Sequence, residues 1–351
     1  LTSIGGDLSI SDNYSLTSLT GLESLVSISG DLWIGQPLYG GSGNPLLTSL
    51  SALNNLDTIG GTIHIIYNET LSVCDVPFIC EYLSDPISKH IAIHDNARGC
   101  DGVMEMAYNC GITYPCLTEG TYDLYSQGDI DYFALVYPGC SNLSASVNIS
   151  GSNITHLDSL SVITSIDGDF KISQTGILNF SGLESLSFIS GDLDLVGDYS
   201  SYWGGCGPEG NHTLIDFTGL EGLDSIGGNL HINCCTSLSS LAELANIESS
   251  TIEDLIIIGN YELSDCEVES ICAYLANPNG DIEIFDNAIG CNSPEEVQDS
   301  CVAHAGYTDM ELSENNIFIY PNPANQELNI SAYGLTMEEI AIYTLTGKKV
   351  Y

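Results

Sequence analysis

The chain has 351 residues, of which 43% are hydrophobic, and 47 Asp and Glu against 5 Lys and Arg give a formal net charge of −42. The apolar content is sufficient for two or three folded domains, so the acidity does not indicate disorder. Such a charge repels phosphate backbones and anionic lipids, so we expect neither nucleic acid nor an anionic membrane surface as a partner. The sequence contains no apolar stretch of about 18 residues, so it predicts no transmembrane segment.

One spacing of apolar residues recurs along the chain. In residues 214–232 the apolar positions follow one another at intervals of 3, 3, 3, 3, 4 and 2, and the same spacing returns in residues 16–34, 47–65, 154–172 and 177–195. A helix would give intervals of 3 and 4 in alternation, and a strand would give intervals of 2. The pattern instead predicts a coil that turns a corner every few residues and closes with a short strand. We interpret each unit as one rung of a solenoid.

Each rung is predicted to end in a strand with two inward apolar residues. The residue between them points outward, which places Trp33 and His231 on exposed faces of parallel sheets. An exposed indole is a good platform for a sugar, although Trp33 could instead pack beneath the insertion that follows it. The predicted strands begin, in chain order, at Leu8, Leu32, Ile63, Ile91, Val147, Phe170, Leu193, Leu230, Leu255 and Ile282.

The 13 cysteines favour disulfides in an oxidising compartment. The spacing Cx5Cx19Cx9C that starts at Cys74 is repeated as Cx5Cx18Cx9C from Cys266, whereas zinc sites usually contain closer pairs. Four cysteines allow three connectivities, and we favour those that join two predicted short helices. The predicted pairs are Cys80 with Cys110, Cys272 with Cys301, Cys74 with Cys100, Cys266 with Cys291, and Cys116 with Cys140.

A long Gly-rich and aromatic insertion separates Leu195 from Leu214. Cys206 within it could pair with Cys234 or with Cys235, and we select Cys235 as the disulfide candidate. Loops held on a rigid scaffold often carry function. The candidate ligand-binding residues are Trp33, Tyr39, Tyr202, Trp203 and His231.

Catalytic signatures are absent from the sequence, which contains no nucleophile motif, phosphate loop or HExxH. A carbohydrate-active β-solenoid enzyme would need two carboxylates facing each other across a groove, and no acidic pair stands out. We therefore expect no enzyme, no cofactor and no metal site. Carboxylate clusters such as Asp192, Asp194 and Asp198 leave Ca²⁺ as an alternative, although they lack the ligand spacing of a calcium loop.

The motif GLxxLxSIxGDLxI, the rungs of about 23 to 25 residues and the Cys-stapled ends resemble receptor L-domains and leucine-rich-repeat-like modules. The resemblance covers residues 1–112 and 114–302. It implies right-handed β-solenoids with short parallel sheets, in modules that bind proteins or glycans or act structurally. We expect an all-β dominated chain with two tandem modules and short helical, disulfide-stapled caps. The first, residues 1–112, is expected to be truncated at its N-terminus, and the second, residues 113–302, to carry an N-terminal cap at 113–143.

A polar linker, residues 303–316, is predicted to precede a segment with a different sequence pattern, residues 317–351. The strand alternation there, and the segments YPNPA and IYTLTGKKVY, resemble the type A C-terminal sorting domain of the type IX secretion system of Bacteroidetes. The resemblance implies a small β-sandwich, here expected to be partial, that engages the type IX machinery during export. The sorting motif consists of Tyr320, Pro321, Asn322, Pro323 and Ala324.

These features predict a secreted protein or one attached to the outer-membrane surface. The function we expect is non-catalytic binding or adhesion, with an extracellular protein or glycan as ligand. The alternative is a structural spacer of a surface or matrix. An exposed patch formed by the candidate aromatic residues would favour binding, and their burial would favour the spacer.

Overall fold

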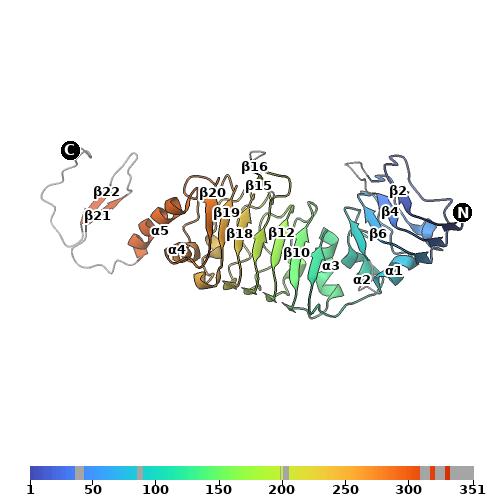
Figure 1. Cartoon of the computed structure of the whole chain (residues 1–351), viewed down its shortest axis with the longest axis horizontal. Coiled ribbons are helices and arrows are strands. Elements are labelled where there is room, and N and C mark those ends of the chain that lie inside the picture. The colour runs from blue at the N-terminus through green and yellow to red at the C-terminus, as the bar shows by residue number, and fades with distance from the viewer. Residues whose placement is uncertain are drawn as a thin grey trace. The chain divides into compact units, whose positions relative to one another are not determined.

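The computed structural model describes residues 1–35, 43–84, 90–197, 199–200, 205–308, 317–320 and 329–332 (Figure 1). The chain forms two compact units, Leu1–Ser300 and Cys301–Tyr351. The two modules predicted on either side of residue 112 both fall largely within the first unit, and their boundary stays a prediction.

Two parallel sheets of the first unit hold the strands that were expected from the apolar spacing. Sheet 1 has the order β2-β4-β6-β7, and sheet 2 has the order β20-β19-β18-β14-β12-β10-β8. Within each sheet the strands pair in parallel with equivalent residues opposite one another, as in Leu193 opposite Leu230. Sheet 1 consists of β2 (Leu8–Ile10), β4 (Leu32–Gly35), β6 (Ile63–Ile66) and β7 (Ile91–His94); sheet 2 consists of β8 (Thr121–Leu124), β10 (Ser146–Ser150), β12 (Phe170–Ser173), β14 (Leu193–Leu195), β18 (Leu230–Asn233), β19 (Leu255–Ile258) and β20 (Ile282–Phe285).

Smaller sheets accompany these two. Two-residue strands form a three-stranded and a four-stranded parallel sheet, and an antiparallel pair lies in the insertion before Leu214. Their bounds are β1 (Ser3–Ile4), β3 (Ser27–Ile28) and β5 (Thr58–Ile59); β9 (Asn142–Leu143), β11 (Ser165–Ile166), β13 (Phe188–Ile189) and β17 (Ser225–Ile226); and β15 (Tyr199–Ser200) with β16 (Gly205–Cys206).

Helices lie between the strands in the described part of the chain. α3 begins at the capping residue Ser126, whose hydroxyl accepts the N–H of Asp129. α5 begins at Pro294 and continues through residues 303–308 of the predicted linker. The α-helices are α1 (Pro77–Leu83), α2 (Val103–Asn109), α3 (Gln127–Val136), α4 (Glu269–Ala276) and α5 (Pro294–Thr308), and the 3-10 helices are η1 (Ser51–Leu53), η2 (Asp158–Leu160), η3 (Ala242–Leu244) and η4 (Ser249–Thr251).

The predicted fold class, all-β dominated with two β-solenoid modules, is wrong. The structure contains several separate parallel sheets with helices interspersed between the strands, an α/β-like arrangement (Figure 1). The predicted strand positions are confirmed. The error lies in the apolar intervals of three, which an all-β coil would use as corners. A 3-10 helix also has three residues per turn, and η1, η2 and η3 occupy such intervals.

The inward side chains of the strands form the core. Phe170, Leu193 and Leu230 stand opposite one another on neighbouring strands and are at most 1% exposed. Phe180 and Phe217, in the connections between strands, are fully buried and stack on each other with ring centroids 5.3 Å apart. Each fully buried side chain of this size contributes about 1.5 to 3 kcal/mol to folding, so the repeated apolar positions are the main source of stability.

Buried and half-buried amide side chains follow the strand ends. The Asn68 Nδ2 donates to the backbone oxygens of Ile34 and Ile66, both at 3.0 Å, and its Oδ1 accepts the Asn44 N–H at 3.0 Å. These bonds satisfy the backbone groups that are exposed where each strand stops. We call this row the asparagine ladder; its members are Asn44, Asn68, Asn96, Asn211, Asn260 and Asn287.

Aspartate side chains hold the opposite ends of the strands. Asp31 precedes β4 and accepts the Thr62 N–H at 2.7 Å, and Asp254 precedes β19 and accepts the Asp281 N–H at 2.8 Å. The aspartate before the strand, in a GD pair at Asp31 and an ED pair at Asp254, therefore connects that strand to the next one in its sheet. Part of the acidity of the chain has this structural role.

Five predicted disulfide pairings can be compared with the structure. Cys74–Cys100, Cys80–Cys110, Cys116–Cys140 and Cys266–Cys291 are confirmed, and Cys272 and Cys301 are both disulfide-bonded.

The assignment of Cys235 to a disulfide is wrong, because Cys206 bonds to Cys234 and Cys235 is a buried free thiol. Cys234 adopts a left-handed turn conformation after β18 and lies against the insertion, with φ 59°. Cys235 takes the next position, within the asparagine ladder, where its N–H donates to the Asn260 Oδ1 at 2.9 Å.

In the second unit, β21 (Ile317–Tyr320) pairs with β22 (Asn329–Ala332) in an antiparallel hairpin. The alternating apolar residues of the tail predict these strands. The residues 321–324 of the sorting motif, and the rest of the predicted β-sandwich, lie outside the described residues.

Candidate ligand-binding cleft

The ligand-binding residues predicted from the sequence do not form one site in the described structure. Trp33 and His231 lie on the outward faces of different sheets, and Tyr39, Tyr202 and Trp203 lie outside the described residues. The Trp33 ring is stacked on the His64 ring, with centroids 3.7 Å apart and an angle of 4° between the planes. One face of the indole is therefore already covered by its neighbour on β6.

His231 is half-buried and engaged by its neighbour on the adjacent strand. Its Nδ1 lies 2.7 Å from the Asp194 Oδ1, and this hydrogen bond raises the pKa of His231. Asp194 in turn stands opposite Lys171 on β12. On the outward face of sheet 2, Lys171, Asp194 and His231 thus form cross-strand pairs.

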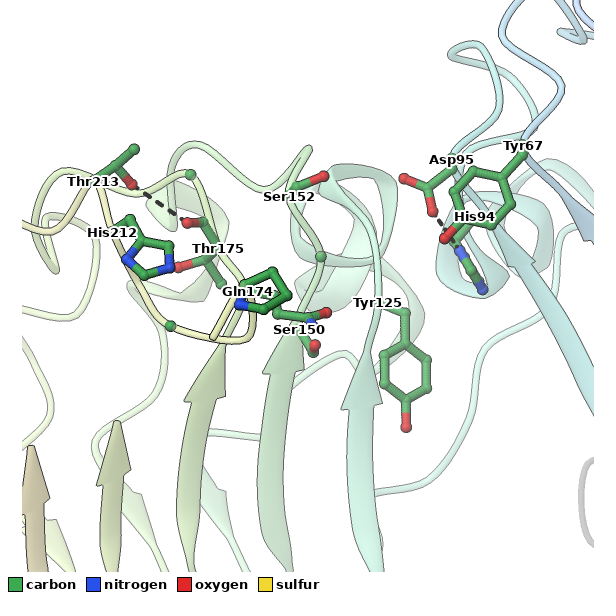
Figure 2. A pocket seen from close by; sticks show the side chains of 14 residues that line it. Tyr67, His94, Asp95, Tyr125, Ser150, Ser152, Gln174, Thr175, His212 and Thr213 are labelled. Carbon is green, nitrogen blue, oxygen red and sulfur yellow. Dashed lines mark hydrogen bonds and ion pairs between the residues drawn. The ribbon is translucent and has the colours of Figure 1, made fainter. Parts of the chain in front are cut away.

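A cleft of about 450 Å³ lies at the C-terminal ends of β6, β7, β8, β10 and β12, where sheets 1 and 2 approach each other. Figure 2 shows Tyr67, His94 and Asp95 on one side of it, and His212, Thr175 and Thr213 on the other. In open α/β sheets the carboxyl ends of parallel strands are the usual place for ligands. The described residues that line the cleft are Tyr67, His94, Asp95, Tyr125, Ser150, Gly151, Ser152, Gln174, Thr175, Gly176, Pro208, Gly210, His212 and Thr213.

A repeated turn projects side chains into the cleft. Tyr67, Asp95 and Gln174 each directly follow a strand and have left-handed φ angles of 59°, 54° and 55°. Each is followed by a residue that is buried or half-buried at the ladder position, as Asn68 follows Tyr67. Because the ladder fixes the backbone on one side of the turn, the preceding residue presents its side chain at the sheet edge.

Tyr67 and Tyr125 supply two half-exposed aromatic rings. Tyr67 is 46% and Tyr125 is 41% exposed, and the His94 ring lies between them, with centroids 6.0 Å from Tyr67 and 6.3 Å from Tyr125. Partial burial raises the pKa of both phenols. Both therefore remain neutral hydroxyl groups beside an apolar ring face.

Histidines on either side are held by hydrogen bonds. The His94 Nδ1 lies 2.8 Å from the Asp95 Oδ2. The His212 Nε2 donates to the Gly207 oxygen and its Nδ1 lies within hydrogen-bond distance of the Thr236 hydroxyl, both at 3.0 Å. Both nitrogens of His212 are thereby occupied, and its ring is fixed in orientation.

Packing between α2 and α3 positions the two sides of the cleft. The Asp129 carboxylate, 2% exposed, accepts the N–H of Met104 on α2 at 2.9 Å and the N–H of Tyr125 at 3.0 Å. Burial raises the pKa of Asp129 to about 6 and that of Asp101 to about 7. The Asp129 carboxylate therefore links α2, which follows sheet 1 in the chain, to Tyr125 in the cleft.

A second hollow of about 480 Å³ adjoins the cleft and shares Tyr67 and Asp95 with it. Asn153 lines this hollow, and its Nδ2 donates to both oxygens of Asp101 at 3.2 Å. Its Oδ1 is buried and has no hydrogen-bond partner among the described residues. This oxygen is therefore an enclosed acceptor that its described protein neighbours leave unsatisfied.

The carboxylates considered for Ca²⁺ are engaged elsewhere. Asp192 accepts the Asn229 N–H at 2.7 Å, Asp194 contacts His231, and Asp198 lies outside the described residues. Within the described ranges, no group of three or more His, Cys, Asp or Glu side chains is arranged to hold a metal ion.

Sequence reasoning missed Tyr67, Asp95, Tyr125 and Gln174. The sequence holds a signal for Tyr67 and Asp95, which directly precede ladder asparagines, whereas Gln174 precedes Thr175, whose N–H donates to the ladder residue Asn211. What the sequence did not provide was which turns would meet, since the cleft combines strand ends from two sheets.

Comparison with known proteins identifies the tail. Residues 318–351 match the family described as a secretion system C-terminal sorting domain, whereas no curated protein and no solved structure matches the chain. The resemblance of residues 1–302 to receptor L-domains and leucine-rich-repeat modules has no support from these comparisons. No helix in the described ranges is long and apolar enough to cross a bilayer. The sorting domain identifies a protein that is exported by the type IX secretion system and is secreted or attached to the outer-membrane surface.

Proposed function

We propose that this exported protein is a non-catalytic binding or adhesion protein and that it holds an extracellular ligand in the cleft between sheets 1 and 2. The observation that carries the proposal is the set of half-exposed aromatic rings, Tyr67 and Tyr125, beside hydroxyl and amide groups on the ends of ordered strands. Ligand sites are commonly concave surfaces with aromatic walls and a few placed polar groups.

The polar groups of the cleft favour binding over catalysis. Asp95 is the one carboxylate among its described lining residues, whereas glycoside hydrolysis usually requires two carboxylates at a defined separation. Asp95 is also paired with His94 at 2.8 Å, and no serine or cysteine nucleophile is hydrogen-bonded to that pair among the described residues.

A structural spacer is the second candidate, and the stacked Trp33 ring favours it. The indole is used in a contact with His64 within sheet 1, so this predicted platform is partly occupied. The strands pair in register, and side-chain hydrogen bonds from asparagines and aspartates hold both ends of the strands. Such an arrangement would also suit a stiff surface component.

The test is a binding screen of the full chain, with disulfides formed, against arrays of extracellular glycans and proteins. The variant carries Tyr67→Ala and Tyr125→Ala, and the matched control carries Tyr14→Ala, which removes a tyrosine that is 60% exposed and is not among the cleft-lining residues. We expect a ligand that is retained by the control and lost by the double variant. A folded protein that binds nothing, or binds equally well in all three forms, would favour the spacer.

A further inference from the structure

We infer that the ligand of the cleft is a neutral, hydroxyl-rich oligosaccharide. This inference rests on the proposed function and specifies its ligand by chemical class. Two features of the cleft carry it: its charge and its ring faces.

The charge of the cleft disfavours acidic ligands. None of its described lining residues is Lys or Arg, Asp95 contributes a carboxylate, and Glu69 lines the adjoining hollow. The chain as a whole carries a formal charge of −42, so a uronate or sulfated glycan would approach against a strongly negative field with no cation to receive it. A neutral ligand avoids this repulsion.

The ring faces suit sugar rings. A pyranose presents an apolar face of C–H groups and a polar rim of hydroxyls, and a tyrosine presents an apolar face and a polar tip. Tyr67 extends from sheet 1 and Tyr125 from the edge of sheet 2, while the oriented His212 ring lies on the far side of the cleft (Figure 2). Because the two hollows share Tyr67 and Asp95, a ligand of several sugar units can occupy both.

The experiment titrates the full, disulfide-bonded chain with three sets of oligosaccharides of equal length. One set is neutral (glucose, mannose and xylose oligomers), one contains uronic acids, and one contains free amino sugars. Titrations are repeated with Tyr125→Ala, with Tyr125→Phe and with the Tyr14→Ala control. Thermal unfolding of each variant verifies that it is folded.

We expect a neutral oligosaccharide to bind, the uronic acid set to bind at least about tenfold more weakly, and Tyr125→Ala to weaken binding by about tenfold. Tyr125→Phe, which keeps the ring face, should retain most of the affinity. Stronger binding of the acidic or the amino set overturns the inference.

The outcome for the two proposals is separable. If a non-sugar ligand from the array binds in a Tyr125-dependent manner and no neutral oligosaccharide does, the ligand class is wrong and the proposed binding function stands. If no ligand of any class depends on Tyr125, both are wrong.

Discussion

The two ends of the same strands use different side chains for the same task. Asp254 precedes β19 and accepts a backbone N–H from the next strand, while Asn260 follows β19 and both accepts and donates. Asp254 is half-buried, whereas Asn260 is fully buried. A carboxylate is tolerated where water reaches it, but a buried position requires a neutral amide that can satisfy both donors and acceptors.

The asparagine end also determines where the cleft can form. The ladder residue is fixed by its hydrogen bonds, so the turn residue before it is free to vary between strands. At β6 and β7 these turn residues are Tyr67 and Asp95, which line the cleft, and at β18 it is Cys234, which forms a disulfide. One backbone geometry therefore supports either cleft-lining side chains or a covalent cross-link.

The sharpest test of the comparison is Asn260→Ala. The change leaves the buried Cys235 N–H without its Asn260 acceptor and removes one donor from the Ile232 oxygen, because Asn260 bonds both, at 2.9 and 2.8 Å. We expect the free energy of unfolding to fall by about 2 to 4 kcal/mol, measured by urea denaturation. If Asn260→Ala lowered the free energy of unfolding by less than Asp254→Ala, at the opposite end of β19, the distinction between the two ends would be contradicted.

Asp129 is a carboxylate in a buried place, and the comparison predicts that it makes stability depend on pH. Its folded pKa of about 6 lies above the unfolded value, so its contribution is complete below the unfolded pKa and is lost as pH rises through about 6. We expect the free energy of unfolding to fall by about 2 kcal/mol between pH 4.5 and 8 on account of this group.

Asp101, whose pKa is raised to about 7 by burial, acts in the same direction. The control for the pH dependence is Asp129→Asn, which loses a hydrogen bond at every pH but should show a shallower slope. An unchanged slope in this variant would refute the assignment to Asp129.

The outward faces give an intermediate effect through two histidines at equivalent strand positions. Asp194 raises the pKa of His231, while burial lowers that of His64. The His231 contribution is therefore present below pH 6.5 and lost above its folded pKa, and the His64 contribution has the opposite sign. Asp194→Asn should reduce stability by about 1 kcal/mol at pH 5.5 and less at pH 8.

NMR titration of both imidazoles checks this expectation directly. The Asp194→Asn change should lower the pKa of His231 and leave that of His64 unchanged. A shift in both histidines would show that the two sheet faces are not independent.

The smallest effect is expected for Asp254→Ala, the counterpart of Asn260→Ala on the same strand. It removes one bond, to the Asp281 N–H, at an edge where water can replace the carboxylate. We expect a loss of about 0.5 to 1 kcal/mol in the same urea experiment. If the loss equalled that of Asn260→Ala, burial would not explain the difference between the asparagine ladder and the aspartates at the opposite strand ends.

Sequence reasoning located the strands because their inward residues alternate and recur, as in Leu230 and Ile232. It assigned the wrong fold class because an apolar interval of three is shared by a corner in a coil and a 3-10 helix such as η3. It also chose Cys235 over Cys234, because adjacent cysteines cannot be distinguished without knowing which one takes the ladder position.

The cleft was harder to predict, because its residues lie in turns that are distant in sequence. Tyr67 and Gln174 precede ladder positions more than 100 residues apart, and only the pairing order of the strands and the packing of α2 on α3 bring their edges together. A turn residue before an asparagine is visible in the sequence at Tyr67 and Asp95 but not at Gln174, which precedes Thr175, and the grouping of these turns is a property of the tertiary structure.

The central claim, that the cleft is the ligand site, is tested most directly by tyrosine nitration with and without a bound oligosaccharide. The full chain is nitrated briefly, digested, and the modification of each tyrosine is quantified by mass spectrometry. We predict that the ligand protects Tyr67 and Tyr125 and leaves Tyr14 equally reactive. Equal nitration of Tyr67 and Tyr125 with saturating ligand present would contradict the claim.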